Sequence, residues 1–123
     1  MKKSTIIKID INGFHKKAVT QSTAETCEFL QAFYEKIEKL ISSRGWRLVK
    51  TIGDCILIEA EKNIEFISKF YLEVISEYQV SMVHRVCEYE ILNVKIGTYS
   101  CEDIVGKDIN RLFLCDSATQ KMV

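Results

Sequence analysis

The stretch that decides the fold is WRLVKTIGDCILIEA, residues 46–60. It contains two short runs that are rich in apolar and β-branched residues, 46–51 and 55–60. The three residues between these runs, Ile52-Gly53-Asp54, form a tight connection that contains glycine, which is typical of a β-hairpin. We therefore predict two antiparallel strands that are joined at this glycine.

Strand-like and helix-like segments alternate on either side of the hairpin. Two further strands are predicted over residues 5–11 and 89–98, and apolar stripes at steps of three and four predict helices from Leu30 to Ile41 and from Ile67 to Tyr78. The polar stretch before the first stripe ends in Ser22-Thr23-Ala24-Glu25, which has the form of a helix N-terminus. A final helix is expected from about Lys107. The order β-α-β-β-α-β-(α) predicts an α+β fold, a ferredoxin-like split βαβ antiparallel sheet with the helices on one face.

Length and charge narrow the functional classes. The chain has 123 residues, which predicts a single domain over residues 1–123. Seventeen basic residues balance seventeen acidic ones, which argues against a dedicated nucleic-acid or membrane-surface binder. No apolar run approaches the ~20 residues of a membrane helix. Lys8 and Asp10 interrupt the first apolar stretch, so no signal peptide is expected.

The five cysteines do not form the pattern of a structural metal site. Their number is odd and no two are spaced as C-x-x-C. We therefore expect reduced cysteines, mostly in the core, in a cytoplasmic protein.

Two acidic residues are notable for their positions. Asp10 ends the first predicted strand and Asp54 lies at the tip of the hairpin, and in a ferredoxin-like sheet these places are neighbours. Two converging carboxylates beside a glycine turn suit one or two Mg²⁺ ions that hold a triphosphate. The other interpretation is that Asp54 is a turn residue and Asp10 a solvated charge at a strand end. Since close carboxylates repel each other without a cation, replacing both with asparagine is expected to leave the metal-free fold as stable or slightly more stable.

The strings around these aspartates closely resemble the two signatures of the class III nucleotidyl cyclases, the adenylyl and guanylyl cyclase catalytic domains. The strings are IDINGF, residues 9–14, and VKTIGD, residues 49–54, and the resemblance runs from about Ile6 to Ala60. It implies that Asp10, Asp54 and the carbonyl of Ile11 bind Mg²⁺ or Mn²⁺. It also implies that the backbone N–H groups of the segment Ile11 to Phe14, which includes Asn12 and Gly13, wrap the β- and γ-phosphates of the nucleotide.

The resemblance also implies a purine site. Lys50 occupies the position that reads the purine, where adenylyl cyclases carry lysine and guanylyl cyclases glutamate, and an ammonium suits the acceptor N1 of adenine. The string DIVGKDIN, residues 103–110, is similar to a third family string. By that similarity Asp103 accepts from the adenine amino group and Asn110 orients the ribose or the transition state. The alternatives are that Lys50 is an exposed strand lysine and that Asp103 favours a helix N-terminus.

The resemblance implies an adenylyl cyclase-like enzyme that converts ATP to cyclic AMP and pyrophosphate at a homodimer interface. One departure stands against activity: Leu114 replaces the arginine that the family carries at this position, and Arg111 is not an obvious substitute. The chain is also shorter than the family pattern. The alternative is therefore a catalytically degenerate cyclase-homology domain that binds nucleotide or protein partners. A third interpretation, other metal–nucleotide chemistry on a palm-like fold, lacks the G-G-[DE]-E-F string of diguanylate cyclases.

Overall fold

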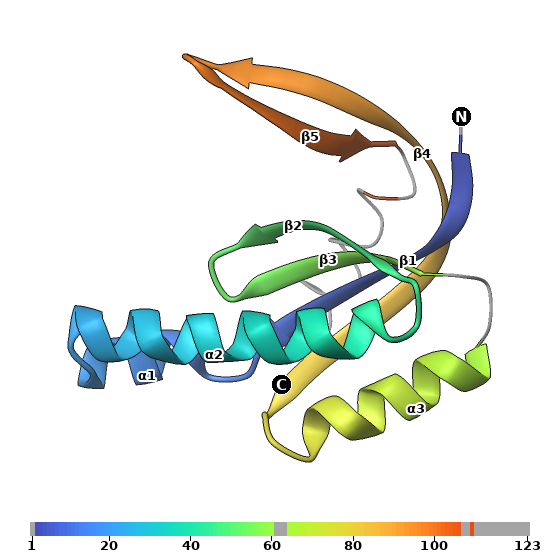
Figure 1. The fold of residues 1–123 in the computed structure, drawn as a ribbon. Coiled ribbons are helices and arrows are strands. Elements are labelled where there is room, and N and C mark those ends of the chain that lie inside the picture. The colour runs from blue at the N-terminus through green and yellow to red at the C-terminus, as the bar shows by residue number, and fades with distance from the viewer. Residues whose placement is uncertain (1, 61–63, 107–108, 110–123) are drawn as a thin grey trace.

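The computed structural model describes residues 2–60, 64–106 and 109. The elements follow one another as β1 (Lys2–Ile11), α1 (Phe14–Thr20), α2 (Thr23–Ser42), β2 (Arg47–Ile52), β3 (Cys55–Ala60), α3 (Ile64–Ile75), β4 (Val80–Ile96) and β5 (Tyr99–Val105). The five strands form one sheet in the order β2-β3-β1-β4-β5, in which each neighbouring pair is antiparallel (Figure 1).

The first four strands have the spatial order of a ferredoxin-like sheet. Strand β3 lies between β1 and β2, so the helical connection from β1 to β2 passes over one strand, and β4 pairs with the other side of β1. Helices α2 and α3 lie on the same face of this sheet (Figure 1). The predicted α+β architecture, with an antiparallel sheet and helices on one face, is confirmed.

The main core lies between that face and the two long helices. Alternate residues of β1 and β3 point into it, because successive side chains of a strand point to opposite faces. The sheet contributes Ile7, Ile9, Ile11, Ile56 and Ile58, and the helices contribute Phe33, Ile37, Ile41, Ile67, Phe70 and Val74. The helical residues are those of the two stripes at steps of three and four, so the same periodicity that predicts the helices also fixes their buried faces.

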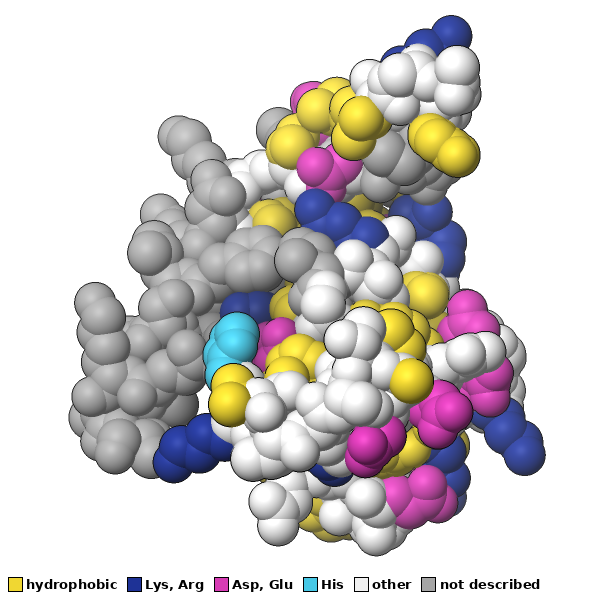
Figure 2. All heavy atoms as spheres, turned by 90° about the vertical axis from the view of Figure 1, so that its left-hand side faces the viewer, with side chains coloured by type: hydrophobic (Ala, Val, Ile, Leu, Met, Phe, Trp, Pro, Cys, Tyr) yellow, Lys and Arg dark blue, Asp and Glu magenta, His cyan; other side chains and the backbone are white. Residues whose placement is uncertain are grey.

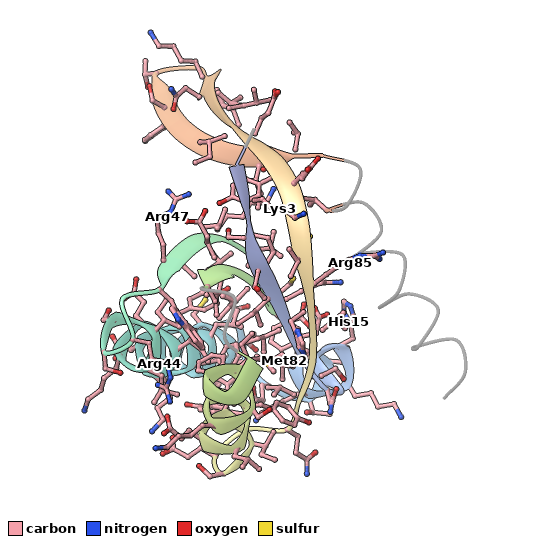
Figure 3. All side chains as sticks on the ribbon, turned by 90° about the vertical axis from the view of Figure 1, so that its right-hand side faces the viewer. Lys3, His15, Arg44, Arg47, Met82 and Arg85 are labelled. Carbon is pink, nitrogen blue, oxygen red and sulfur yellow. The ribbon has the colours of Figure 1, made fainter. Side chains whose placement is uncertain are left out.

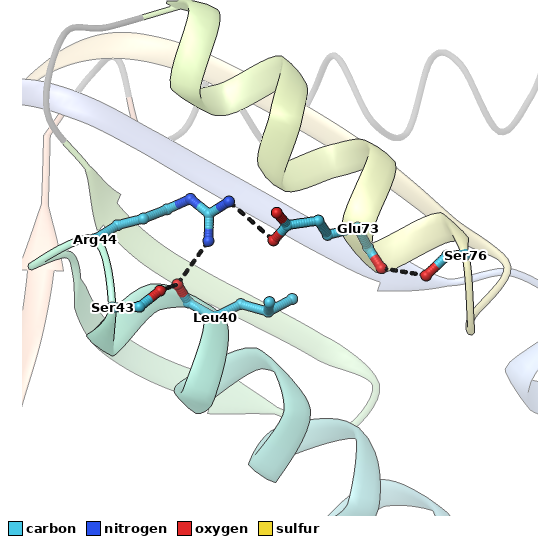
Figure 4. A network of polar contacts seen from close by, with 5 residues as sticks. All are labelled: Leu40, Ser43, Arg44, Glu73 and Ser76. Atoms are coloured by element: carbon cyan, nitrogen blue, oxygen red, sulfur yellow. Dashed lines mark hydrogen bonds and ion pairs between the residues drawn. The ribbon is translucent and has the colours of Figure 1, made fainter.

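Side-chain caps and ion pairs set the ends of the long helices. The hydroxyl oxygen of Ser22 accepts a hydrogen bond from the Glu25 N–H at 3.1 Å, as the sequence predicts for the start of α2. Beyond the last turn of α2, the guanidinium of Arg44 donates to the carbonyl oxygen of Leu40 and pairs with Glu73 of α3 at 2.9 Å (Figure 4). These contacts hold the C-terminal end of α2 against α3.

The opposite face of the sheet is covered by the chain itself. Strand β4 pairs with β1 as far as Tyr89 and with β5 from Glu90 onward, and the β4–β5 hairpin arches over β2 and β3 (Figure 1). A second, smaller core results from this arch, formed by Ile6, Leu57, Cys87, Tyr89, Ile104 and Ile109. This face carries the candidate site.

Three expectations from the sequence need correction. The polar stretch after Gly13 contains the short helix α1, and the predicted strand 89–98 begins nine residues earlier, at Val80, and ends at Ile96. Residues 99–105 form strand β5, so Asp103 lies in a strand and not at the start of a helix. The helix expected from about Lys107 lies outside the described residues, apart from the buried Ile109.

The cysteine expectation holds in part. Cys55 and Cys87 are reduced and buried, whereas Cys27 is reduced and exposed on α2. Within residues 2–60, 64–106 and 109, no helix is long and apolar enough to cross a membrane.

Candidate functional site

The two aspartates meet at one end of the sheet. Asp10 is the register partner of Cys55, the residue that follows Asp54, and the N–H of Ile11 donates to the carbonyl oxygen of Asp54 at 3.3 Å. The tight turn before Asp54 depends on Gly53, whose φ of +57° is strained for any residue with a Cβ. The structure therefore brings these positions together, as the sequence indicates.

A lysine and a thiol surround the Asp10 carboxylate. The ammonium of Lys8 lies 3.4 Å from its Oδ2, and the two side chains are only 8% and 14% exposed. The Cys55 thiol also shares a hydrogen bond with Asp10. Burial, followed by the negative charge of Asp10, raises the pKa of Cys55 to about 12, so this thiol stays protonated at neutral pH. Sequence reasoning did not assign a role to either residue.

Tyr34 of α2 fixes the hairpin that carries Asp54. Its hydroxyl donates to the carbonyl oxygen of Gly53. Burial raises the pKa of Tyr34, and the nearby charge of Asp54 adds to the rise. The sequence pattern placed Tyr34 in the apolar stripe of the helix, and the only signal of its second role was a hydroxyl at the edge of that stripe.

The segment between β1 and α1 is exposed and held by its backbone. The N–H of Asn12 donates to the carbonyl oxygen of Gln79 at 2.9 Å, and the Ser81 hydroxyl donates to Asn12 Oδ1 at 2.5 Å. Gly13 adopts a φ of +67°, and α1 begins at Phe14 with no side-chain cap. In a helix, each N–H donates to the carbonyl oxygen four residues earlier. For the first N–H groups of α1 that carbonyl lies before the helix begins, so these groups have no acceptor within it.

Lys50 and Asp103 form an ion pair between strands at opposite edges of the sheet. The ammonium of Lys50 lies 2.5 Å from Asp103 Oδ1, and the side chains are 30% and 38% exposed. Asp103 Oδ1 also accepts the N–H of Ile104 at 2.8 Å. The hydrogen bond from Lys50 lowers the pKa of Asp103. The arch of the β4–β5 hairpin brings β5 over β2, so these two residues, both expected at a purine site, are in direct contact.

Both groups of residues lie on the same face of the sheet. On β3, Leu57 pairs with Lys8 of β1 on one side and with Lys50 of β2 on the other. Cys55, two residues before Leu57 on the same strand, pairs with Asp10 of β1. Figure 3 shows the alternation along β4, where Met82 lies on the side of α3 and Arg85 points away from it. The candidate residues therefore lie on the face of the sheet opposite α2 and α3.

Charged side chains of both signs are mixed on the side of the molecule that lies at the left in Figure 1. In Figure 2, which shows this side, acidic, basic and hydrophobic side chains are interspersed over the described part of the surface, in keeping with the zero net charge. The open groove between α3 and β4 contains none of the candidate residues and is lined by Ile67, Ser68, Tyr71, Leu72, Met82 and His84.

The donor set fits a metal that arrives with a nucleotide. Among the described residues there is no group of three or more His, Cys, Asp or Glu side chains that could hold a metal ion alone. Magnesium, however, is usually bound through one or two carboxylates and the phosphates of the substrate. Asp10, Asp54 and the Ile11 carbonyl supply that kind of incomplete oxygen set.

Three residues named from the sequence lie outside the described residues: Asn110, Arg111 and Leu114. The structure does not bear on the roles expected for them, and these stay predictions.

Comparison with known proteins gives a consistent result. The adenylate and guanylate cyclase catalytic domain family matches residues 1–111. The chain is 28% identical over 107 residues to the soluble guanylate cyclase gcy-31 of Caenorhabditis elegans, which covers 83% of this chain and 15% of that protein. The fold superposes on a bacterial light-regulated adenylyl cyclase with a TM-score of 0.79 at 16% identity, covering 96% of this chain and 70% of that one. For the guanylyl cyclase Cya2 the TM-score is 0.74 at 16% identity, with coverage of 95% and 70%. This chain belongs to the adenylate and guanylate cyclase catalytic domain family.

Proposed function

We propose that the chain is an adenylyl cyclase domain that converts ATP to cyclic AMP and pyrophosphate in a homodimer, with Mg²⁺ or Mn²⁺ as cofactor. The observation that carries the proposal is the ion pair between Lys50 and Asp103 on the same face as the meeting point of Asp10 and Asp54. One half of this face offers oxygen ligands for cations, and the other offers a donor and an acceptor side by side.

The metal half would hold the triphosphate. Asp10, Asp54 and the Ile11 carbonyl would bind one or two divalent ions, and the backbone N–H groups of residues 12–14 would contact the β- and γ-phosphates. When bound, the ions supply activation of the ribose 3′-hydroxyl and neutralise charge on the α-phosphate and the leaving pyrophosphate. Tyr34 would keep the hairpin tip in place during this step through its bond to the Gly53 carbonyl.

The ion-pair half would choose the base. Adenine presents an acceptor, N1, beside a donor, the amino group, and the pair offers the complementary donor from Lys50 and acceptor from Asp103. Guanine presents a donor at N1 and an acceptor at O6, which would oppose each of these groups. Asn110 would orient the ribose.

A homodimer would combine the two halves. Each chain carries both, and in the proposed dimer the metal half of one chain would face the base half of the other, giving two equivalent sites. The projecting β4–β5 hairpin carries exposed apolar side chains, including the register pair Ile96 and Tyr99, which would suit burial against a second copy. Sedimentation at micromolar concentration should show a dimer, or a monomer–dimer equilibrium that ATP and Mn²⁺ shift towards dimer. A strict monomer under all these conditions would contradict the homodimeric site.

The activity test is incubation of the purified chain with each nucleoside triphosphate and Mn²⁺ or Mg²⁺, with cyclic nucleotides detected by mass spectrometry. We expect cyclic AMP from ATP and no product after Asp54→Asn, which keeps the size and turn preference of the residue but removes a charge. Absence of product from every nucleotide, together with measurable ATP binding, would favour the degenerate binding domain that Leu114 suggests.

The base test is a charge swap. Lys50→Glu combined with Asp103→Lys keeps an ion pair between β2 and β5 but exchanges donor and acceptor, so nucleotide preference should move from ATP towards GTP. The single change Lys50→Glu is the control, because it places two carboxylates together and should weaken ATP binding without a comparable gain for GTP. An unchanged ATP:GTP ratio in the double variant would refute purine reading by this pair.

A further inference from the structure

A buried lysine lies beside the carboxylate that we assign to the metal. Lys8 and Asp10 are two residues apart on β1, so their side chains point to the same face of the sheet. The Lys8 ammonium is 3.4 Å from Asp10 Oδ2, and its side chain is 8% exposed. Lysine is almost never this deeply buried unless its charge is paired.

The surroundings of Lys8 direct its charge towards the site. Its register partners are the buried Leu57 on β3 and the half-buried Val83 on β4, so apolar side chains flank its stem on both sides. The ammonium is therefore kept at the end of the sheet where Asp10 and Asp54 meet.

We propose that Lys8 is the resident cation of the metal site: it neutralises Asp10 in the nucleotide-free protein and competes with a divalent ion for that carboxylate. Divalent metal then binds tightly only together with the triphosphate. This inference rests on the proposed function, since it requires Asp10 to be a metal ligand.

The charges explain the dependence on nucleotide. Asp10, Asp54 and Lys8 together carry one net negative charge that can attract a divalent ion. The Lys8 ammonium also repels that ion, and water screens this repulsion only weakly because the site is partly buried. The triphosphate brings several negative charges of its own and supplies oxygen ligands that two carboxylates lack. Binding of the metal–nucleotide complex is then favourable although binding of the metal alone is not.

The test is the Mn²⁺ affinity of the nucleotide-free protein, measured from the free Mn²⁺ signal in electron paramagnetic resonance. Lys8→Met keeps the length of the side chain in its apolar surroundings and removes the charge, and we expect Mn²⁺ to bind at least tenfold more tightly. Lys95→Met is the matched control, because it removes the same charge from an exposed position on β4 and should change the affinity less than twofold. Adding Asp10→Asn to Lys8→Met should abolish the gain.

Two further measurements keep the proposal falsifiable. If Lys8→Met does not fold, Lys8→Gln retains a polar end and should also bind Mn²⁺ more tightly. In either variant, Mn²⁺ alone should raise the thermal unfolding midpoint by more than it does in the wild type. Unchanged Mn²⁺ affinity in a folded Lys8 variant would overturn the proposal. If such a variant also binds metal-free ATP more weakly, Lys8 is a phosphate ligand instead.

The failure of this inference is distinguishable from the failure of the proposed function. If Asp10→Asn weakens Mn²⁺–ATP binding in the wild-type background while Lys8→Met leaves Mn²⁺ affinity unchanged, the metal site stands and the role of Lys8 is wrong. If neither variant changes metal or nucleotide binding, Asp10 is not a metal ligand, and both proposals fail.

Discussion

The contact between Lys8 and Asp10 makes a prediction about stability that opposes the one made from the sequence. Two close carboxylates without a cation are expected to repel each other, so their removal should be neutral or slightly stabilising. In the structure, however, Asp10 is the partner of a lysine that is 8% exposed. Asp10→Asn removes the carboxylate charge 3.4 Å from that ammonium, and this should destabilise the fold.

The magnitude follows from the burial of the pair. Removal of one partner of a buried ion pair costs about 3–5 kcal/mol. Asparagine still offers an oxygen that can accept from Lys8, so we expect about 3 kcal/mol, or a Tm about 10 °C lower for a chain of this length. Asp54→Asn is the control, because asparagine is as acceptable as aspartate in a tight turn, and it should change stability by no more than about 0.5 kcal/mol.

The assay is urea unfolding in metal-free buffer of the wild type, Asp10→Asn, Lys8→Met and the double variant. The two side chains interact directly, so their effects on stability should not be additive. The summed losses of unfolding free energy in the two single variants should exceed the loss in the double variant by at least about 1 kcal/mol. Stability of Asp10→Asn within about 0.5 kcal/mol of the wild type, or additivity of the two changes, would refute the reasoning.

Three further outcomes can be checked. The pKa of Asp103 lies below its ordinary 3.8, so the stability that its ion pair contributes is present above about pH 4 and is lost as the pH falls further. Asp103→Asn should therefore remove this loss of stability at low pH from urea midpoints measured between about pH 3 and 7. An unchanged pH profile in the variant would contradict the prediction. A Cβ at Gly106 would lie 2.6 Å from the carbonyl oxygen of Glu88, so Gly106→Ala should lower the unfolding free energy by about 1–3 kcal/mol. A variant as stable as the wild type would show that the backbone shifts there at little cost. At pH 8 iodoacetamide should modify Cys27 and spare the buried Cys55, whose pKa is about 12. Equal labelling of the two cysteines in peptide mass spectra would show that the pairing of β1 with β3 opens at Cys55.

Much of the fold follows from local sequence patterns. The hairpin at Gly53, the strand that ends at Ile11 and the two long helices were predictable, because each buries one face against a common core and so repeats its apolar residues at its own period. The strings around Asp10 and Asp54 also identified the family, since a tight turn and a strand end each need particular residues at fixed spacing. These features depend on neighbours in the chain.

Other features depend on contacts between distant residues. Strand β4 changes partner near Tyr89 and its polar residues interrupt the alternation, so no local period marks its start at Val80. The arch of the β4–β5 hairpin is also a tertiary feature, and only that arch places Asp103 against Lys50 across the sheet.

The sequence by itself determined strands β1 to β3, the two long helices, the family and the places of the two aspartates in the fold. Only the tertiary structure decided which charges those residues meet. Lys8 stands two positions before Asp10 in the sequence. Its electrostatic effect, however, comes from burial between Leu57 and Val83, which two other strands contribute. Burial lowers the screening by water, and this turns an ordinary strand lysine into a strong electrostatic partner. The strength of a charge interaction is set by the surrounding medium, and the medium exists only after the strands have assembled.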